Sequence, residues 1–390
     1  MIRILLGAAL LLAAACAPAA PPAPPTPTAN PAAVTPSPAG GSAAPSPSPA
    51  ARPTAYNTLP VPSVSEQARR DAEAVFRGKT ARIIVGLSAG GGYDTMARTV
   101  ARHLGKHLPG NPTIIVENQT GAAGAVAANT VFNTAPRDGT VLHLFTETLL
   151  QSQMLGQEGI QFDARQFVWL GSTQVQTITC IARADSGIAS FQDLLGGAKQ
   201  LRVGATSPGT NTHDFPTTLK GALGANIQVV PGYPGTNEIR LAMERGETNG
   251  ACIPWESLKV TSAQWFAGPD RFARVLVQQG AEKHPDLQDV PLAEELAPSP
   301  RERQIIRAIT GALAISKPFV APPGVPPERA AVLRAAFLET MNDPEFRQDA
   351  ERTGVELQPS SPEATQRIAD EILSTPPDVV SELKRILGSS

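Results

Sequence analysis

The most informative stretch of the chain runs Ile83-Ile84-Val85-Gly86-Leu87-Ser88-Ala89-Gly90-Gly91-Gly92-Tyr93-Asp94-Thr95-Met96-Ala97-Arg98. Its first part is a short apolar run with β-branched residues, which is typical of a buried strand. The three consecutive glycines allow positive φ angles and a close approach of the backbone to a bound molecule. Asp94 is placed to act as the N-cap of a helix that extends to His107. The stretch therefore predicts a strand, a turn and a helix N-terminus suited to an anionic ligand.

The N-terminal residues read as an export signal followed by a tether. Residues 1–16 combine Arg3 with an apolar run that is too short to span a bilayer, and they end in Ala13-Ala14-Ala15-Cys16. This ending resembles the lipobox of bacterial lipoproteins, so we expect Cys16 to be lipidated; plain cleaved secretion and an uncleaved anchor are the alternatives. Residues 17–58 are almost entirely Pro, Ala, Ser and Thr, which predicts a disordered tether.

The composition of the chain excludes several classes of function. The net charge is −2, from 33 Lys and Arg against 35 Asp and Glu, and aromatic residues make up 5%. Without a basic face or stacking platforms, nucleic acid is not an expected partner. The chain has five dispersed histidines and neither Cys-x-x-Cys nor His-Glu-x-x-His, so we expect no metal and no cofactor. Cys180 and Cys252 lie in apolar runs; we expect buried free thiols, with a disulfide as the alternative.

Alternating apolar and amphipathic segments predict an α/β fold with helices on both faces of parallel sheets. The expected strands are Arg82–Leu87, Thr113–Glu117, Thr140–Phe145, one within Phe167–Ile181, Arg202–Ala205, Ile227–Val230, Gly250–Ile253 and Ala273–Val277. The remainder is expected to be mostly helical, with a proline-rich break at Pro318–Pro327. Four of the strands are followed by a polar, glycine-bearing turn and a helix, which indicates a ligand site at the carboxyl ends of the strands.

Several of these turns resemble the motifs of one family, the Bug/TctC extracytoplasmic solute receptors of tripartite tricarboxylate transporters. The similar segments, in chain order, are Ser88–Arg98, Val116–Gly124, Ala135–Leu142, Ala205–His213, Val230–Gly235 and His284–Pro291. Their order and spacing match over about Lys79 to Gly354. The chain resembles a divergent member, because Ala123 stands where the family usually has glycine and the lysine of its V-P-Y-K-G motif is absent.

The resemblance implies a two-lobed, type II periplasmic-binding-protein-like fold with two open mixed sheets and a ligand cleft between them. Lobe 1 would comprise residues 79–178 plus 281–390, and lobe 2 residues 179–280. The ligand would be a small mono-, di- or tricarboxylate. By this resemblance, the residues expected to bind it are Ser88, Gly90, Gly91, Gly92, Tyr93, Asp94, Gly121, Ala122, Ala123, Gly124, Ser207, Thr210, Asn211, His213, Tyr233 and Gly235.

The resemblance also implies how the protein works. Lobe closure would capture the carboxylate and present it to the membrane subunits of a tripartite transporter. The protein would be an exported monomer, held at the membrane only by the lipid on Cys16, with no catalytic residue.

Two other interpretations stay open. One is a free-standing sensor or scavenging receptor without a transporter. The other is an α/β-hydrolase with Ser207 as nucleophile, because Ala205-Thr206-Ser207-Pro208-Gly209 differs by one residue from G-x-S-x-G. Asp270 and His284 would complete that triad. Pro208 argues against it, because proline has no N–H for the oxyanion hole.

Overall fold

The computed structural model describes residues 58–280 and 282–388, which lie in one compact unit (Ala55–Ser390). The predicted export signal, the lipidation site Cys16 and all of the tether except Thr58 lie outside the described residues. Among the described helices, none has the length and apolar character needed to cross a membrane.

The first of two sheets has the strand order β2-β1-β3-β10-β4. Its strands are β1 (Thr80–Val85), β2 (Thr113–Asn118), β3 (Val141–Leu144), β4 (Val168–Gln174) and β10 (Ser316–Ala321). Strand β1 pairs in parallel with β2 and β3, whereas β10 runs antiparallel between β3 and β4. The antiparallel direction has a consequence for the site: β10 begins at the edge where β3 ends.

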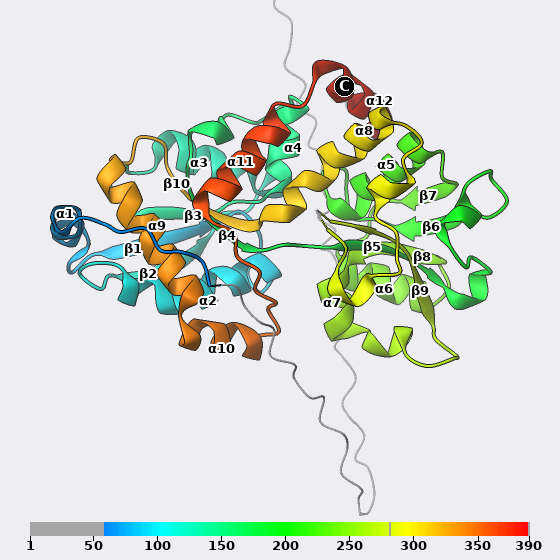
Figure 1. The fold of residues 1–390 in the computed structure, drawn as a ribbon, viewed down its shortest axis with the longest axis horizontal. Coiled ribbons are helices and arrows are strands. Elements are labelled where there is room, and N and C mark those ends of the chain that lie inside the picture. Colours follow the sequence, from blue (N-terminus) through cyan, green and yellow to red (C-terminus); the bar gives the residue numbers. More distant parts are fainter. Residues whose placement is uncertain (1–57, 281, 389–390) are drawn as a thin grey trace, which may run out of the picture. The chain divides into compact units, whose positions relative to one another are not determined.

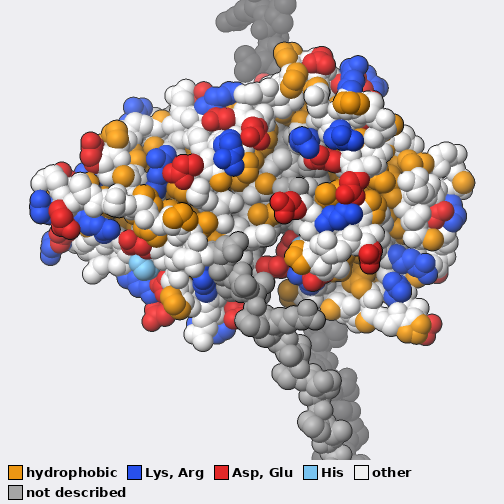
Figure 2. All heavy atoms as spheres, in the orientation of Figure 1, with side chains coloured by type: hydrophobic (Ala, Val, Ile, Leu, Met, Phe, Trp, Pro, Cys, Tyr) orange, Lys and Arg blue, Asp and Glu red, His pale blue; other side chains and the backbone are white. Residues whose placement is uncertain are grey.

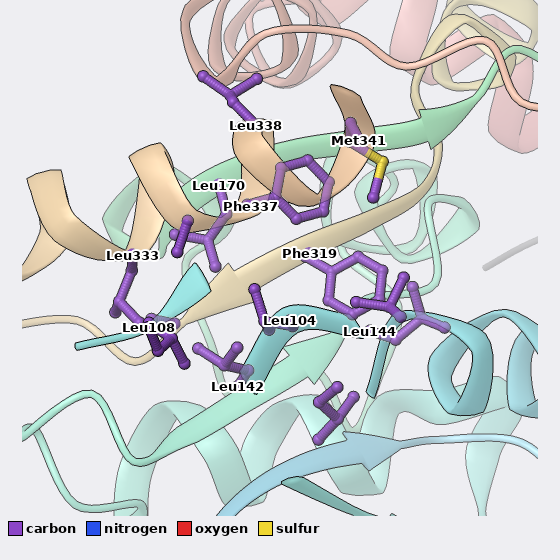
Figure 3. Close-up of a cluster of buried hydrophobic side chains, with 14 of the residues drawn as sticks. Leu104, Leu108, Leu142, Leu144, Leu170, Phe319, Leu333, Phe337, Leu338 and Met341 are labelled. Carbon is purple, nitrogen blue, oxygen red and sulfur yellow. The ribbon is translucent and has the colours of Figure 1, made fainter. Parts of the chain in front are cut away.

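Helices cover this sheet and close its core. They are α1 (Glu66–Phe76), α2 (Gly92–His107), α3 (Ala125–Thr134), α4 (Thr148–Met154), α9 (Pro327–Asn342), α10 (Pro344–Arg352) and α11 (Pro362–Leu373). Figure 3 shows Leu333, Phe337 and Met341 of α9 directed at the sheet, toward Phe319 of β10. The Phe319 and Phe337 ring centres lie 5.5 Å apart. Burial of such aromatic and aliphatic side chains is the main stabilisation of this layer.

The second sheet has the order β7-β6-β8-β5-β9. Its strands are β5 (Ile178–Arg183), β6 (Leu201–Gly204), β7 (Ile227–Val230), β8 (Gly250–Pro254) and β9 (Ala273–Gln279). Helices α5 (Asn211–Leu223), α6 (Thr236–Glu244) and α7 (Trp255–Thr261) follow β6, β7 and β8 (Figure 1). Both sheets are therefore mixed, as expected from the family resemblance, and not purely parallel.

Two C-terminal helices pack beside the second sheet's own helix α5. Helices α8 (Pro300–Thr310) and α12 (Pro377–Leu387) both contact α5, and Ile306 of α8 belongs to the core around β5 and β6. Short 3-10 helices cover 122–124, 164–166, 184–186, 191–194, 263–266, 285–287, 293–296 and 311–315. The chain after residue 281 thus contributes packing to both sheets.

The structure corrects three expectations about the elements. The single strand expected within Phe167–Ile181 is two strands, β4 and β5, in different sheets. The proline-rich break at Pro318–Pro327 contains most of strand β10, in which Pro318 has no N–H to donate but takes part in the sheet through its carbonyl, which accepts a bond from Phe145 N at 2.9 Å. Cys180 and Cys252 are not free thiols: they lie opposite one another on β5 and β8 and form a disulfide.

Candidate functional site

The first glycine turn leads directly into helix α2. The N-cap is Gly91, not Asp94 as expected, and the helix starts at Gly92. Asp94 instead sits in the first turn, where its Oδ2 accepts bonds from Gly90 N and Arg98 Nε, both at 2.9 Å. The bond from Arg98 lowers the Asp94 pKa to about 2, so the carboxylate is charged at neutral pH. Asp94 therefore stabilises the turn, although its buried Oδ1 has no partner among the described residues.

The second loop holds an unusual backbone. Gly121, Ala122, Ala123 and Gly124 have φ angles of 138°, 46°, 52° and 100°. Left-handed conformations are unfavourable for alanine and mark sites where the surroundings fix the loop. A Cβ on Gly86 would lie 2.6 Å from Gly124 Cα, so the end of β1 and this loop are in direct contact. Ala122 and Ala123 are exposed, as are Ser88, Gly90, Gly91 and Gly92 in the first turn.

A third connection, after β3, brings a buried carboxylate to the same edge. Glu147 is 2% exposed and accepts the Tyr93 hydroxyl through Oε2. The same oxygen accepts Lys317 N at 3.3 Å, and Oε1 accepts the Ser316 hydroxyl at 3.4 Å. Burial, and then the Glu147 charge, raise the Tyr93 pKa, which keeps the hydroxyl protonated as the donor. Glu147 therefore links the Tyr93 side chain of α2 to the backbone of β10.

Lys317 is the cation nearest to this arrangement. It lies in β10 with a left-handed φ of 51°. Its Nζ donates to Gln174 Oε1 and lies 5.5 Å from the centre of the Tyr93 ring. A Cβ on Gly92 would lie 3.9 Å from Lys317 Cε, which places the lysine beside the first residue of α2. Burial lowers the Lys317 pKa, although Glu147 and Glu256 act in the opposite direction.

The turn after β6 is built from hydroxyl groups. Hydrogen bonds of 2.8 to 3.1 Å connect the Oγ1 atoms of Thr206, Thr210 and Thr212. Thr212 Oγ1 also accepts Thr206 N at 3.1 Å. The N-cap of α5 is Thr210, and Asn211 begins the helix.

A histidine–aspartate pair closes the same turn. Asp214 Oδ1 accepts Gly209 N at 3.2 Å and lies 2.8 Å from His213 Nδ1. His213 is thereby tied to its own turn. Ser207 is exposed, and its carbonyl accepts the Thr210 hydroxyl at 2.6 Å.

Tyr233 and Gly235 follow β7. A Cβ on Gly204 would lie 2.9 Å from the Tyr233 ring, so this ring packs flat against the end of β6. Gly235 is the N-cap of α6 in an extended conformation. Both positions shape the turn, and Tyr233 remains partly exposed.

Residues of the two halves line one small pocket. Gly209, Thr210 and Asn211 face residues of helix α4 and the turn after it, which are Thr148, Gln151, Ser152, Leu155 and Gln157.

Figure 2 shows charged side chains of both signs interspersed on the face in view.

A half-buried carboxylate, Glu256, lies near the link between the two sheets. Glu256 at the start of α7 accepts Thr177 N at 2.9 Å through Oε1, and its Oε2 is buried without a partner in the described part of the chain. Burial raises the Glu256 pKa to about 7. On the next turn of α7, Lys259 binds Asp286 and Glu356 at 3.1 and 2.9 Å.

The predicted residues thus fall into two groups, one at each sheet. Ser88–Asp94 and Gly121–Gly124 come together at one edge of the first sheet, and Ser207–His213 with Tyr233–Gly235 lie at one edge of the second. Sequence reasoning missed Glu147 and Lys317. Glu147 follows a buried strand without a glycine, and Lys317 lies in a strand that was not expected; the one signal was a lone lysine between the apolar segments 312–315 and 319–321.

Comparison with known proteins agrees with this architecture. The model of the tripartite tricarboxylate transporter family receptor, TctC, matches residues 96–384. A UPF0065 protein from Bordetella pertussis is 25% identical over 79% of this chain and 90% of its own. A TctC solute binding protein from Polaromonas has a TM-score of 0.61 at 20% identity, over 79% of this chain and 99% of that one.

Some of the similar structures contain a bound organic acid. MatC from Rhodopseudomonas palustris, described with bound malate, has a TM-score of 0.56 at 20% identity, over 78% of this chain and 100% of that one. With the family model covering most of the described residues, the chain belongs to the tripartite tricarboxylate transporter receptor family, TctC.

Proposed function

We propose that this protein is an extracytoplasmic receptor that captures a small carboxylate and delivers it to the membrane subunits of a tripartite tricarboxylate-type transporter. The observation that carries the proposal is the edge of the first sheet. There, an exposed glycine turn leads into the N-terminus of the 16-residue helix α2 beside an exposed left-handed loop and a half-buried lysine. Free N–H groups and the helix dipole favour an anion at such a place.

The ligand class is supported by the receptors with a similar fold. MatC is described with malate, and a second R. palustris protein, with a TM-score of 0.57 at 20% identity over 80% of this chain and 98% of its own, is described with adipate. We propose an organic acid of this size for the present chain.

Capture would proceed by closure of two lobes, one around each sheet; helices α8 and α12, from the segment 281–390 expected in lobe 1, pack on α5 of the second sheet. The first group of loops would hold the carboxylate, and Ser207, Thr210, Asn211 and His213 would contact the rest of the ligand. The hydroxyl groups of this turn can both donate and accept, so they suit ligand hydroxyl and keto oxygens. Closure around a ligand shifts a pre-existing equilibrium by the difference in affinity between the open and closed states.

We further propose export and a lipid anchor at Cys16, with residues 17–58 as a tether. This keeps a binding protein near its transporter while its lobes move freely. A hydrolase is not the proposed function, because His284 Nδ1 accepts Asp286 N at 3.1 Å and its ring lies beside Trp255 rather than near Ser207.

The test is a thermal-shift screen of the purified protein against mono-, di- and tricarboxylic acids, with neutral sugars and cationic amino acids as controls. Binding to the native state raises Tm in a dose-dependent way. We expect stabilisation by one or more acids only. Stabilisation by neutral sugars or cations alone would contradict the proposal.

A further inference from the structure

A half-buried lysine lies at the edge of the first sheet where the anion is expected. Within the described residues, Lys317 Nζ donates one hydrogen bond, to Gln174 Oε1, a neutral amide oxygen. The amide of Gln174 is fixed because its Nε2 donates to Glu356 O at 2.7 Å. Within the described ranges 58–280 and 282–388, no ion pair is recorded for the Lys317 ammonium. Burial lowers the Lys317 pKa and the charges of Glu147 and Glu256 raise it, but an ammonium has three N–H donors, and the bond to Gln174 uses one of them.

Glu147 contacts the backbone of Lys317, but it does not hydrogen-bond the Lys317 ammonium. Glu147 uses Oε2 for the Tyr93 hydroxyl and Lys317 N, and Oε1 for the Ser316 hydroxyl. These bonds bind the backbone of β10 and the ring of Tyr93 rather than the lysine ammonium. Glu147 therefore holds Lys317 in place and leaves its Nζ for another acceptor.

The position of the lysine points to the ligand. Its Cε lies against Gly92, where the free N–H groups of α2 begin, and its Nζ lies above the Tyr93 ring. The side chain is partly exposed, so it is not sealed in the core. The left-handed φ of 51° is unfavourable for lysine, which is typical of a position kept for function.

We propose that Lys317 is a ligand-binding residue that pairs directly with a carboxylate of the bound acid, together with the N-terminal N–H groups of helix α2. This inference rests on the proposed function and deepens it: the ligand must place a charged carboxylate beside Gly92 and Tyr93. A charge-assisted bond of this kind discriminates an acid from its neutral amide.

The experiment is titration calorimetry with malate, adipate and adipamide on the full chain and on Lys317→Met. Losing one charge-assisted hydrogen bond weakens binding by roughly 10- to 100-fold, so we expect that loss for the acids. Adipamide should bind weakly to both proteins. Lys106→Met is the matched control, because Lys106 lies in the last turn of helix α2, at the end away from Gly92. Its affinities should stay within about twofold of wild type.

Folding is checked by Tm without ligand, which should fall by only a few degrees in Lys317→Met, because the variant loses its bond to Gln174. If Lys317→Met does not fold, Lys317→Gln replaces it. Wild-type affinity for the acids in a folded Lys317 variant would overturn this inference and leave the proposed function standing. Wild-type protein that binds neither these acids nor any other in the thermal-shift screen would overturn both.

Discussion

The turns before α2 and α5 use the same device with different chemistry. In each, an aspartate in the first turns of the helix accepts the N–H of a preceding glycine and contacts a basic side chain: Asp94 with Gly90 and Arg98, Asp214 with Gly209 and His213. The α2 turn then adds Lys317 and Glu147, whereas the α5 turn adds three threonine hydroxyls.

This difference suggests a division of work between the two sheets. The first edge carries fixed charge and would hold the ligand's carboxylate. The second edge carries threonine hydroxyl groups, which can either donate or accept a hydrogen bond, and would contact the remaining ligand atoms. The variants that follow each change residues at one of the two sheets.

The largest expected effect on stability is at the second sheet. Replacing both Cys180 and Cys252 by alanine removes the cross-strand disulfide, whose cysteines are 72 residues apart in sequence. Closing a loop of this length stabilises a protein by about 2 to 4 kcal/mol, so the double variant should unfold at correspondingly lower urea. Chemical denaturation with and without reductant measures it. A wild-type protein indifferent to reductant would show that the disulfide does not form.

At the first sheet, Gly86→Ala should separate the end of β1 from the second loop. Its Cβ would lie 2.6 Å from Gly124 Cα, and relief of such overlap costs about 1 to 3 kcal/mol. We also expect weaker acid binding, because the left-handed loop must move. Gly209→Ala is the comparison at the α5 turn: no atom lies within 4 Å of its Cβ, so its cost is only that of the positive φ. Equal losses in the two variants would contradict the close packing at Gly86.

The pH dependence of Asp94 tests the charged turn. Its folded pKa of about 2 lies below the ordinary 3.8, chiefly because of the Arg98 bond. The stability it contributes is therefore present above about pH 4 and lost as the pH falls through 2. Asp94→Asn should cost about 1 to 2 kcal/mol at pH 7, since Arg98 is partly exposed and solvent screens the pair. The deficit against wild type should shrink toward pH 2; a constant deficit would exclude this linkage.

The smallest effect is expected in the hydroxyl cluster. Thr212→Val keeps the shape but leaves Thr206 N without its acceptor, which costs about 1 kcal/mol. The unfolding free energy from urea titration measures it, with Thr217→Val as control, because Thr217 bonds only its own helix carbonyl at His213. A neutral Thr212→Val would indicate that water replaces the lost bond.

Much of the fold could be predicted because local signals agreed. Strand Ile227–Val230 has the expected bounds, since its apolar run ends at a turn residue on each side, and the other strands before the glycine turns lie within two residues of the expected bounds. Strand β10 was missed because Pro318 interrupts its pattern and Pro322 and Pro323 follow it, and its place between β3 and β4 depends on tertiary pairing. The disulfide depends on the register of β5 against β8, which spacing along the chain does not contain.

In the site, too, the features that depend on tertiary pairing could not be predicted from the sequence. The glycine turns could be located from sequence because a positive φ requires particular residues. The role of Asp94 could not, since an N-cap and an N3 carboxylate share one sequence pattern. Lys317 and Glu147 come from distant segments, and only the antiparallel entry of β10 brings them together.

The central claim is that the first sheet's edge holds the ligand's charge. The most direct test is the dissociation constant for malate of Lys317→Met and of Thr210→Val, each divided by that of wild type. We predict a loss of roughly 10- to 100-fold for Lys317→Met and of less than about tenfold for Thr210→Val, because a charged bond contributes more than a neutral one. An equal or larger loss in Thr210→Val would contradict the account.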